Sequence, residues 1–341
     1  MNKHVLITGG TTSVGRALVR QIWRKFPDAE VTLLAWSEEK AVYDTLRTEL
    51  ESEFSLWDGQ LTLHSGDIGD SVLGLKETLY EELRQSVTHV VHLAEASRQC
   101  MDKERLVQTN VIGSENVVYF ASRAERLQLL LHFSDAGVAG IAASAFAETE
   151  FEHERDFRNL YERSQYEAEE SVRSLLAKTP ICILRVGHIL DPWRLERWLN
   201  EARWAAKLPG RPALGDETPF HIVDPLHVAD TSVQLLAADS AAGKTYHLVN
   251  QNPMSGQRLF AELMQASSGK SPGATWNLGK WNIVAALPVI GGPSSLNASE
   301  RSAFYQGASV MPASAEVWPA RTAETTELLR HAMGDGDVRP S

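Results

Sequence analysis

Short runs of apolar residues alternate along the chain with segments in which apolar residues recur at helical spacing. The runs predict buried β-strands, and the periodic segments predict amphipathic helices between them. Strands and helices that alternate in this way form a parallel sheet covered on both faces. The pattern therefore predicts an α/β fold with a doubly wound parallel sheet. The expected strands are 3–8, 30–35, 61–64, 88–93, 127–133 and 181–184, and the expected helices include 38–53, 77–84, 102–126, 159–176 and 192–207.

The first strand is followed by a turn of glycines and small residues that opens directly into a helix. Glycine permits the tight turn and lets the backbone approach a phosphate, while the N–H groups at the helix start attract the anion. The turn thus predicts a Rossmann-type site for the pyrophosphate of a dinucleotide. A plain strand-to-helix turn without a ligand is the alternative. The residues expected to bind the cofactor here are Gly9, Thr11, Thr12, Ser13, Val14 and Gly15.

Proline and glycine become frequent after residue 209, and the helical segments become shorter. We therefore expect a dinucleotide-binding domain over 1–190 and a smaller C-terminal substrate lobe over 191–333. Within this lobe, 220–250 is expected to return to the sheet. Residues 334–341 are expected to form a disordered tail. The tryptophans of the helix predicted at 192–207 suggest an apolar or acyl small-molecule substrate.

Charge and cysteine content limit the possible partners and compartments. The 341 residues carry a formal net charge of −11, which argues against nucleic acid and anionic membranes as partners. No apolar run approaches the roughly 18 residues of a membrane span, and the strand at the N-terminus leaves no room for a signal peptide. The two cysteines have neither disulfide nor metal-site spacing. We therefore expect a soluble cytoplasmic protein without a metal site.

Several short motifs follow one another in a characteristic order from Val5 to Asp230. They are Thr8-Gly9 with Gly15, Gly66-Asp67-Ile68, His92-Leu93-Ala94, Asn110 with Gly113 and Asn116, Phe133-Ser134, Asn159-Leu160-Tyr161 with Ser164, Leu184-Arg185 with Gly187, and Phe220 with Val223-Asp224 and Val228-Ala229-Asp230. In these motifs the chain resembles the extended short-chain dehydrogenase/reductase superfamily. The thioester-reductase-like and fatty acyl-CoA-reductase-like branch is the most similar.

The resemblance implies a nicotinamide dinucleotide, NADP or NAD, that lies across the strand ends. Gly9 and Gly15 would flank its pyrophosphate. Asp67 and Ile68 would lie beside the adenine, and Ala94 along the cofactor. In the active site, Asn110 would act through the backbone, and Tyr161 would be the catalytic acid. Members of the family often form homodimers through two long helices, here about 110–126 and 161–176.

The chain departs from the family pattern where the family's chemistry takes place. The lysine that follows the catalytic tyrosine by four residues is Gln165, and the substrate hydroxyl at the end of the fifth strand is matched by Asp135, after Ser134. The remaining departures concern the cofactor. The middle glycine of the phosphate turn is replaced by Thr12 in the extended spacing, or by Ser13 in the classical spacing. Glu95 replaces an alanine, and Trp36 replaces the arginine that reads the NADP 2′-phosphate.

These substitutions change the expected chemistry. Tyr161 and Gln165 share one helix face, so Gln165 could still bond the nicotinamide ribose but supplies no charge. A tyrosine without a neighbouring cation has a pKa of about 10 and is a poor base at neutral pH. Asp135 would disfavour the phenolate further. Glu95 would either repel the cofactor phosphates or point to solvent. Trp36 could stack on adenine, and Arg16 and Lys40 are candidates for a 2′-phosphate contact.

Three hypotheses follow. The first is an atypical NAD(P)-dependent oxidoreductase that reduces a carbonyl or acyl-thioester substrate. The second is a lyase, cyclase or isomerase on the same fold, with Asp135 as base and Tyr161 as acid. The third is a non-catalytic binding protein. For polar side chains other than these candidates we expect structural roles. The run Glu167, Glu169 and Glu170, for example, predicts a solvated helix face.

Overall fold

The computed structural model describes residues 2–96, 100, 102–141, 146–152, 156–190, 192–207, 219–250 and 252–268. The predicted tail 334–341, and the part of the predicted substrate lobe from 269 to 333, lie outside these residues. The chain forms two compact units. The first holds the chain up to Val138, Leu160–Val186 and Pro225–His247. The second holds Ala139–Asn159, Gly187–Asp224 and the described residues from Leu248 onward.

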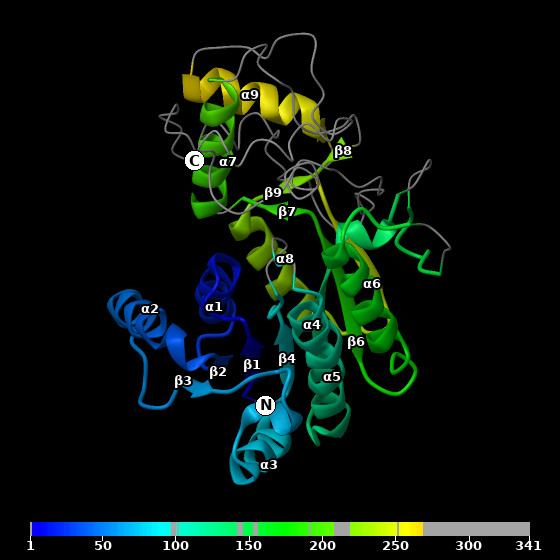
Figure 1. Cartoon of the computed structure of the whole chain (residues 1–341). Helices are drawn as coiled ribbons and strands as arrows, with labels where there is room; N and C mark the ends of the chain where they lie inside the picture. The colour runs from blue at the N-terminus through cyan, green and yellow to red at the C-terminus, as the bar shows by residue number, and fades with distance from the viewer. Residues whose placement is uncertain are drawn as a thin grey trace. The chain divides into compact units, whose positions relative to one another are not determined.

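A single sheet organises the first unit. It consists of β1 (His4–Thr8), β2 (Glu30–Ala35), β3 (Leu61–Ser65), β4 (His89–His92), β5 (Leu129–Asp135), β6 (Ile181–Val186) and β10 (Thr245–Leu248). The strand order is β10-β6-β5-β4-β1-β2-β3 (Figure 1). β1 pairs in parallel with β2 and with β4, so the direction of winding reverses between β1 and β4. This confirms the predicted Rossmann-type sheet, in which ligands bind beyond the carboxyl ends of the strands at such a reversal.

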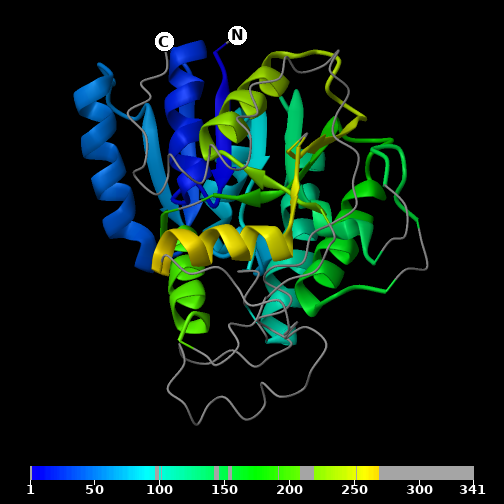
Figure 2. The same cartoon turned by 90° about the horizontal axis from the view of Figure 1, so that it is seen from above.

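Helices cover both faces of this sheet. They are α1 (Ser13–Lys25), α2 (Lys40–Glu53), α3 (Glu77–Ser86), α4 (Lys103–Leu106), α5 (Gly113–Arg123), α6 (Leu160–Arg173) and α8 (Pro225–Ala237). α1 packs against α8, whereas α5 packs against α3 and α6. Figure 2 shows these two groups on opposite sides of the strands. The apolar strand residues are almost fully buried, as expected for a sheet that is covered twice.

Two local features differ from the expected pattern and affect the site. The strand predicted at 127–133 runs from Leu129 to Asp135, so Asp135 is the last residue of β5 rather than part of a following loop. The helix predicted within 102–126 contains a π-helical segment, η3 (Val107–Ile112), between α4 and α5. Single π-helical turns inside helices are often associated with functional sites. Asn110 lies in this segment.

The second unit has its own small apolar core. Two short strand pairs, β7 (His188–Ile189) with β9 (Ile222–Val223) and β8 (Pro219–Phe220) with β11 (Met254–Ser255), accompany α7 (Pro192–Ala205) and α9 (Gly256–Ser268). α7 and α9 pack together, and Trp198 is buried among the apolar side chains of this core. Trp198 therefore packs in the interior of this unit.

Candidate active site

The phosphate turn is a backbone structure that excludes side chains at its glycines. Gly9 has a φ of +71°, and a Cβ there would lie 2.8 Å from the backbone nitrogen of Ala94. A Cβ on Gly15 would lie 2.5 Å from backbone atoms of Gly10. The turn therefore fits closely between the ends of β1 and β4. Such a cradle suits the pyrophosphate of a dinucleotide, as expected from the sequence.

Thr12 replaces a glycine without opening the turn. Its hydroxyl accepts a hydrogen bond from the Gly15 N–H at 3.1 Å and donates to the Gly9 carbonyl at 2.9 Å. Thr12 is thus the N-cap of α1, which satisfies one of the helix-end N–H groups. Ser13 and Val14 form the first turn of that helix, and Val14 is buried. The Thr11 hydroxyl donates to the carboxylate of Glu39 in the short 3₁₀ segment η1 (Ser37–Glu39).

The residues predicted near the adenine lie after β2 and β3. Trp36 directly follows β2 and is partly exposed. The Asp67 carboxylate accepts a hydrogen bond from the Gly69 N–H at 2.8 Å. The Ile68 side chain is buried, and its carbonyl accepts a bond of 2.8 Å from the Asn116 amide of α5. The loop after β3 is therefore held firmly against α5.

A group of polar side chains surrounds Tyr161 at the carboxyl ends of β4 and β5. The Tyr161 hydroxyl donates to Oε2 of Glu95 at 2.7 Å, and the Gln165 amide donates to the same oxygen at 2.8 Å. A second carboxylate, that of Asp135, lies 3.4 Å from the Tyr161 hydroxyl. Tyr161, Gln165 and Asp135 are buried, whereas Glu95 is exposed. We call these four residues the tyrosine cluster.

The structure thus places Glu95 nearer to the Tyr161 hydroxyl than Asp135. Asp135 directs its other oxygen to the Gly137 N–H, which donates at 2.6 Å. The sequence singled out Glu95 only as a residue that would repel the cofactor, and it did not anticipate the contact with Tyr161. The sequence did contain a clue to this contact. The chain lacks the family's lysine and carries an additional glutamate, and two such departures can compensate for each other. In the structure Glu95 and Gln165 do so through one hydrogen bond.

Asn110 holds the backbone around the tyrosine cluster. Its side-chain oxygen accepts a bond from the Ala96 N–H at 2.7 Å, just after Ala94 and Glu95. Its amide donates to the Ser164 hydroxyl at 2.8 Å, and Ser164 donates to the Tyr161 carbonyl at 2.8 Å. The π-helical segment therefore links the end of β4 to α6. This arrangement agrees with the backbone role that the resemblance implies for Asn110.

Ser134 belongs to a different group of side chains. Its hydroxyl donates to Glu169 at 2.5 Å, and Glu169 forms a fully buried ion pair of 2.7 Å with Arg185. Although burial alone would raise the pKa of Glu169, the neighbouring Arg185 and Arg173 and the Ser134 hydroxyl lower it to about 2. The prediction that Glu169 forms part of a solvated helix face is wrong, because its side chain faces the sheet. Ser134 is engaged in this buried pair and not in the tyrosine cluster.

Two buried histidines lie side by side on β4 and β5. The rings of His92 and His132 are 5.3 Å apart, and His92 bonds the hydroxyls of Thr8 and Ser114 at 2.8 Å and 3.1 Å. Burial lowers the pKa of His92 well below its ordinary value and that of His132 to about 4. Both imidazoles are therefore neutral near pH 7. Their strands lead directly to Glu95 and Asp135.

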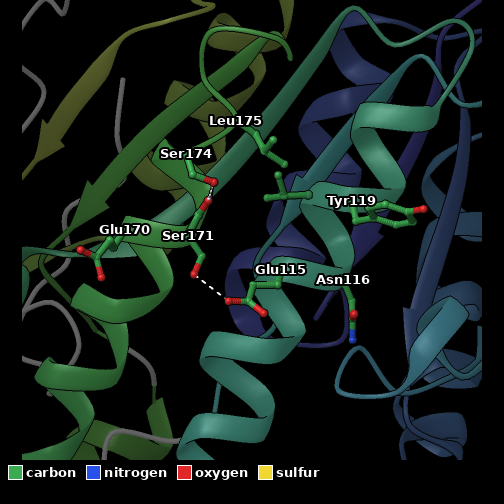
Figure 3. A pocket seen from close by; sticks show the side chains of 8 residues that line it. Glu115, Asn116, Tyr119, Glu170, Ser171, Ser174 and Leu175 are labelled. Atoms are coloured by element: carbon green, nitrogen blue, oxygen red, sulfur yellow. Dashed lines mark hydrogen bonds between the residues drawn. The ribbon is translucent and has the colours of Figure 1, made fainter.

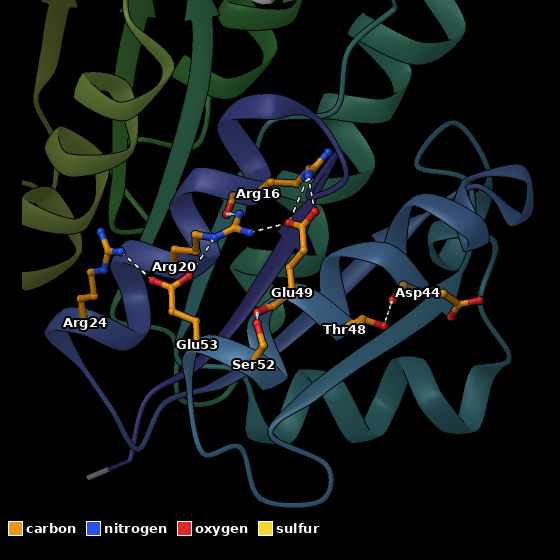
Figure 4. Close-up of polar contacts among 8 residues, drawn as sticks. All are labelled: Arg16, Arg20, Arg24, Asp44, Thr48, Glu49, Ser52 and Glu53. Carbon is orange, nitrogen blue, oxygen red and sulfur yellow. Dashed lines mark hydrogen bonds and ion pairs between the residues drawn. The ribbon is translucent and has the colours of Figure 1, made fainter. Parts of the chain in front are cut away.

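The cations proposed for a 2′-phosphate contact already have carboxylate partners. Figure 4 shows Arg16, Arg20 and Arg24 of α1 facing Glu49 and Glu53 of α2. The Arg16 guanidinium lies 3.2 Å from Glu49. On α2 itself, Lys40 lies 2.9 Å from Asp44. Arg16 therefore serves mainly to join the two helices, and Lys40 forms an ion pair within its own helix.

A surface hollow of about 510 Å³ lies between α5 and α6 (Figure 3). A hydrogen bond of 2.8 Å from Ser171 to Glu115 crosses it. The hollow lies on the helix pair for which the resemblance implies a homodimer contact, and that contact stays a prediction. Its lining residues are Glu115, Asn116, Val118, Tyr119, Glu170, Ser171, Ser174 and Leu175.

Comparison with known proteins identifies the family. The model of the male sterility protein family, named NAD_binding_4, matches residues 7–208. The chain belongs to this family. The match confirms the predicted membership of the extended short-chain dehydrogenase/reductases, in the thioester-reductase-like branch. The expected cofactor class, NADP or NAD, is that of this NAD-binding family, and at the level of the family the match supports NAD(P)-dependent acyl reduction.

Individual relatives agree with this assignment. The probable fatty acyl-CoA reductase 5 of Arabidopsis thaliana is 31% identical over 157 residues, which are 41% of this chain and 32% of the relative. The nonribosomal peptide synthetase asaC of Aspergillus flavus is 24% identical over 275 residues, 73% of this chain and 26% of the relative. The chain thus spans about a third or less of the length of these curated relatives.

Among solved structures, the terminal R domain of the myxalamid PKS-NRPS pathway superposes with a TM-score of 0.61 at 21% identity, and 89% of each chain is covered. This likeness concerns the fold. Within the described part of the chain, no helix has both the length and the apolar character that crossing a membrane requires. The same residues contain no group of histidine, cysteine and carboxylate side chains suited to a metal ion.

Proposed function

We propose that this chain is a nicotinamide-dependent reductase that acts on an acyl thioester or a related carbonyl compound. The observation that carries the proposal is the family match over 7–208, because this stretch contains both the phosphate turn and the helix of Tyr161. Relatives that match part of the chain bear the name fatty acyl-CoA reductase. An apolar acyl group on a thiol carrier is therefore the proposed substrate.

A nicotinamide dinucleotide held at the phosphate turn of Gly9 and Gly15 would supply the hydride that the carbonyl carbon takes up. Tyr161 gives its phenolic proton to the carbonyl oxygen, so that the added hydride and proton leave a neutral hemithioacetal. Its carbon–sulfur bond then breaks, the hydroxyl proton passes to the sulfur, and an aldehyde and a free thiol result. Proton donation by a positioned side chain contributes typically about 10²- to 10⁴-fold to such a rate.

Glu95 and Gln165 keep Tyr161 in its protonated form in this scheme. A carboxylate that accepts a hydrogen bond from the hydroxyl at 2.7 Å favours the neutral phenol over the phenolate. Because Glu95 is exposed, it can take up a proton from water and return it to Tyr161 after each turnover. The Gln165 amide holds the Glu95 carboxylate at 2.8 Å. This arrangement suits reduction, which consumes a proton, better than alcohol oxidation, which needs a base.

The test is the consumption of NADPH or NADH by the purified chain with long-chain acyl-CoA and with the corresponding aldehyde, together with identification of the product. We expect turnover with the wild type and a loss of about 10²-fold or more in Tyr161→Phe. Tyr119→Phe is the matched control, because Tyr119 is an exposed tyrosine on α5. The control should keep wild-type activity.

The proposal fails if the wild type binds the cofactor but oxidises it with neither substrate. It also fails if Tyr161→Phe retains full turnover. If the chain instead converts a substrate without oxidising the nicotinamide, the non-redox proton transfer by Asp135 and Tyr161 replaces it.

A further inference from the structure

The turn that follows β5 fixes the orientation of the Asp135 carboxylate. This turn is the 3₁₀ segment η4 (Ala136–Ala139), in which the Gly137 N–H donates to Oδ1 of Asp135 at 2.6 Å. The other carboxylate oxygen, Oδ2, lies 3.4 Å from the Tyr161 hydroxyl. One oxygen is therefore bonded to the backbone, while the other faces the group that gives the proton in the proposed reaction.

The absence of a side chain at Gly137 allows this arrangement. A Cβ at this position would lie 2.7 Å from Oδ1 of Asp135 and 2.8 Å from Cγ of Glu162 on α6. Glycine thus lets the carboxylate reach the backbone N–H and lets α6 approach the end of β5. Tyr161 precedes Glu162 on that helix, so the same close packing brings its hydroxyl near Asp135.

Two carboxylates approach a phenol that has a single proton to donate. The Tyr161 hydroxyl donates to Glu95 at 2.7 Å, and Asp135 lies at the longer distance of 3.4 Å. A substrate oxygen that lies about 2.8 Å from the Tyr161 hydroxyl can at the same time lie about 2.8 Å from Oδ2 of Asp135. A hydroxyl at that point could give its proton to Asp135.

A carboxylate at this position can do what a hydroxyl cannot. The family pattern places a hydroxyl at the end of the fifth strand, and a hydroxyl can donate a hydrogen bond to a carbonyl oxygen. A carboxylate accepts hydrogen bonds and protons instead. In the proposed reaction the carbonyl oxygen becomes the hydroxyl of a hemithioacetal, which has to lose its proton before the carbon–sulfur bond breaks. Asp135 therefore suits this second step.

We propose that Asp135 is the catalytic base that breaks down the hemithioacetal, an inference that rests on the proposed reduction of a thioester. Oδ2 takes the proton of the hemithioacetal hydroxyl. The electron pair of that O–H bond forms the aldehyde C=O bond, and the electron pair of the C–S bond leaves with the sulfur. Asp135 then passes the proton to the thiolate, because a thiolate is a stronger base than a carboxylate. The products are an aldehyde and a free thiol.

The first test needs no nicotinamide, because this step transfers no hydride. An aldehyde and a thiol form a hemithioacetal reversibly in water, and NMR exchange between the aldehyde and hemithioacetal proton signals measures the rate. With octanal and coenzyme A as probes, the whole wild-type chain should accelerate this exchange. Asp135→Asn keeps the shape of the side chain without the base, and the acceleration should fall by about 10²-fold. Asp28→Asn is the matched control, because Asp28 is an exposed aspartate that precedes β2.

The second test follows a single turnover of octanoyl-CoA with NADPH or NADH by rapid mixing. Nicotinamide absorbance reports the hydride step, and a chromogenic thiol reagent reports the release of coenzyme A. The two signals should coincide in the wild type, whereas in Asp135→Asn thiol release should be slower than nicotinamide oxidation by about tenfold or more. Tyr161→Phe should slow both signals together. Gly137→Ala, which keeps the carboxylate but displaces it, should give a smaller delay and serves as the second variant if Asp135→Asn does not fold.

The outcomes separate this inference from the proposed function. It is overturned if the wild type does not accelerate the exchange, if Asp135→Asn accelerates it equally well, or if this variant slows both signals together without a delay between them. Reductase turnover in which thiol release does not depend on Asp135 would keep the proposed function and remove the inference. Exchange that depends on Asp135 in a chain that oxidises neither NADPH nor NADH would do the reverse.

Discussion

The phosphate turn and the tyrosine cluster lie at neighbouring strand ends, but backbone atoms form the first and side chains form the second. The turn is made by backbone: Gly9 and Gly15 leave no space for a Cβ, and the one unusual side chain, Thr12, caps a helix. The cluster is made by side chains: Tyr161 and Gln165 donate to a single oxygen of Glu95. The first depends on shape and the second on charge and hydrogen bonds.

This difference explains how each region accommodates its departures from the family pattern. A backbone structure accepts a substitution whose side chain fills an existing role, as the Thr12 hydroxyl does at the helix start. A cluster of polar groups accepts a substitution only if the partners change with it, because an unsatisfied buried polar group is costly. The exchange of lysine for Gln165 is accompanied by Glu95 in place of alanine. We infer that the two positions act as a pair.

The largest effect is expected where the backbone leaves no space. Gly9→Ala would place a Cβ 2.8 Å from the Ala94 nitrogen in a residue with a φ of +71°. Left-handed strain and overpacking together should cost about 4 kcal/mol in the free energy of unfolding. Dinucleotide affinity should fall by about 100-fold or more, since the turn must shift. Chemical denaturation and cofactor titration would measure the two effects.

Gly243→Ala distinguishes the steric clash of an added Cβ from the backbone strain of a positive φ. Gly243 also has a positive φ, +79°, but a Cβ there would meet no atom within 4 Å. We expect a loss of only about 1–2 kcal/mol and unchanged cofactor affinity. Equal effects of the two variants would mean that the turn is not limited by space, and the contrast with the tyrosine cluster would lose its basis.

The strands beneath the tyrosine cluster should make the fold sensitive to mild acid. Burial lowers the pKa of His132 to about 4, whereas the unfolded chain protonates this group near ~6.5. Above about pH 6.5 the His132 imidazole is neutral in both the folded and the unfolded state, and it does not reduce the free energy of unfolding. As the pH falls below this value only the unfolded state takes up the proton, which lowers the free energy of unfolding by about 2 kcal/mol at pH 5 for this residue alone.

Urea denaturation between pH 7 and pH 5 would measure this loss, and His132→Leu is the comparison variant. Without the imidazole the stability should decline less steeply, although His92 still contributes because burial also lowers its pKa. An identical pH dependence in both proteins would assign the loss to other groups. Glu169 affects only a lower range: its folded pKa of about 2 means that its contribution is lost below about pH 4.5.

The smallest expected effect tests whether Glu95 and Gln165 act as a pair. The double variant Glu95→Ala/Gln165→Lys restores the residues of the family pattern and places a cation on the helix face of Tyr161. A nearby cation favours the phenolate, so turnover should rise by about tenfold, and alcohol oxidation should gain most. Initial rates in both directions would show this.

The single variants complete the comparison. In Gln165→Lys the ammonium should pair with Glu95, so the gain should be smaller than in the double variant. In Glu95→Ala the Tyr161 hydroxyl and the Gln165 amide both lose their acceptor, and turnover should fall. If the effects of the two single variants simply add, the two positions are independent and the interpretation as a pair is wrong.

Much of the frame of the site could be predicted from local patterns. The alternation of apolar runs and amphipathic segments predicted the sheet, and the glycine spacing predicted the turn after β1. The spacing of Tyr161 and Gln165 predicted that they share a helix face. Strand ends were less certain: β5 ends at Asp135, beyond the predicted end, because the limits of a buried strand are decided by its neighbours.

The choice of partners could not be predicted in this way. Ser134 and Asp135 are consecutive, yet Ser134 bonds Glu169 and Asp135 lies near Tyr161, although both partners belong to the same helix, α6. From the sequence we expected Trp36 to contact adenine, and we had no expectation for Arg105. In the structure the guanidinium carbon of Arg105 lies 5.5 Å from the centroid of the Trp36 ring. Their contact joins segments that follow different strands, and no local pattern encodes it.

By itself, the sequence determined the order of strands and helices, the phosphate turn and the residues that reach the strand ends, because these follow from periodicity and backbone conformation over short distances. Only the tertiary structure decided which of these residues meet. It placed Glu95 rather than Asp135 closest to the Tyr161 hydroxyl and put Arg105 on Trp36. Such contacts depend on how strands far apart in the chain are aligned, and hydrogen bonds are sensitive to differences of a few tenths of an ångström.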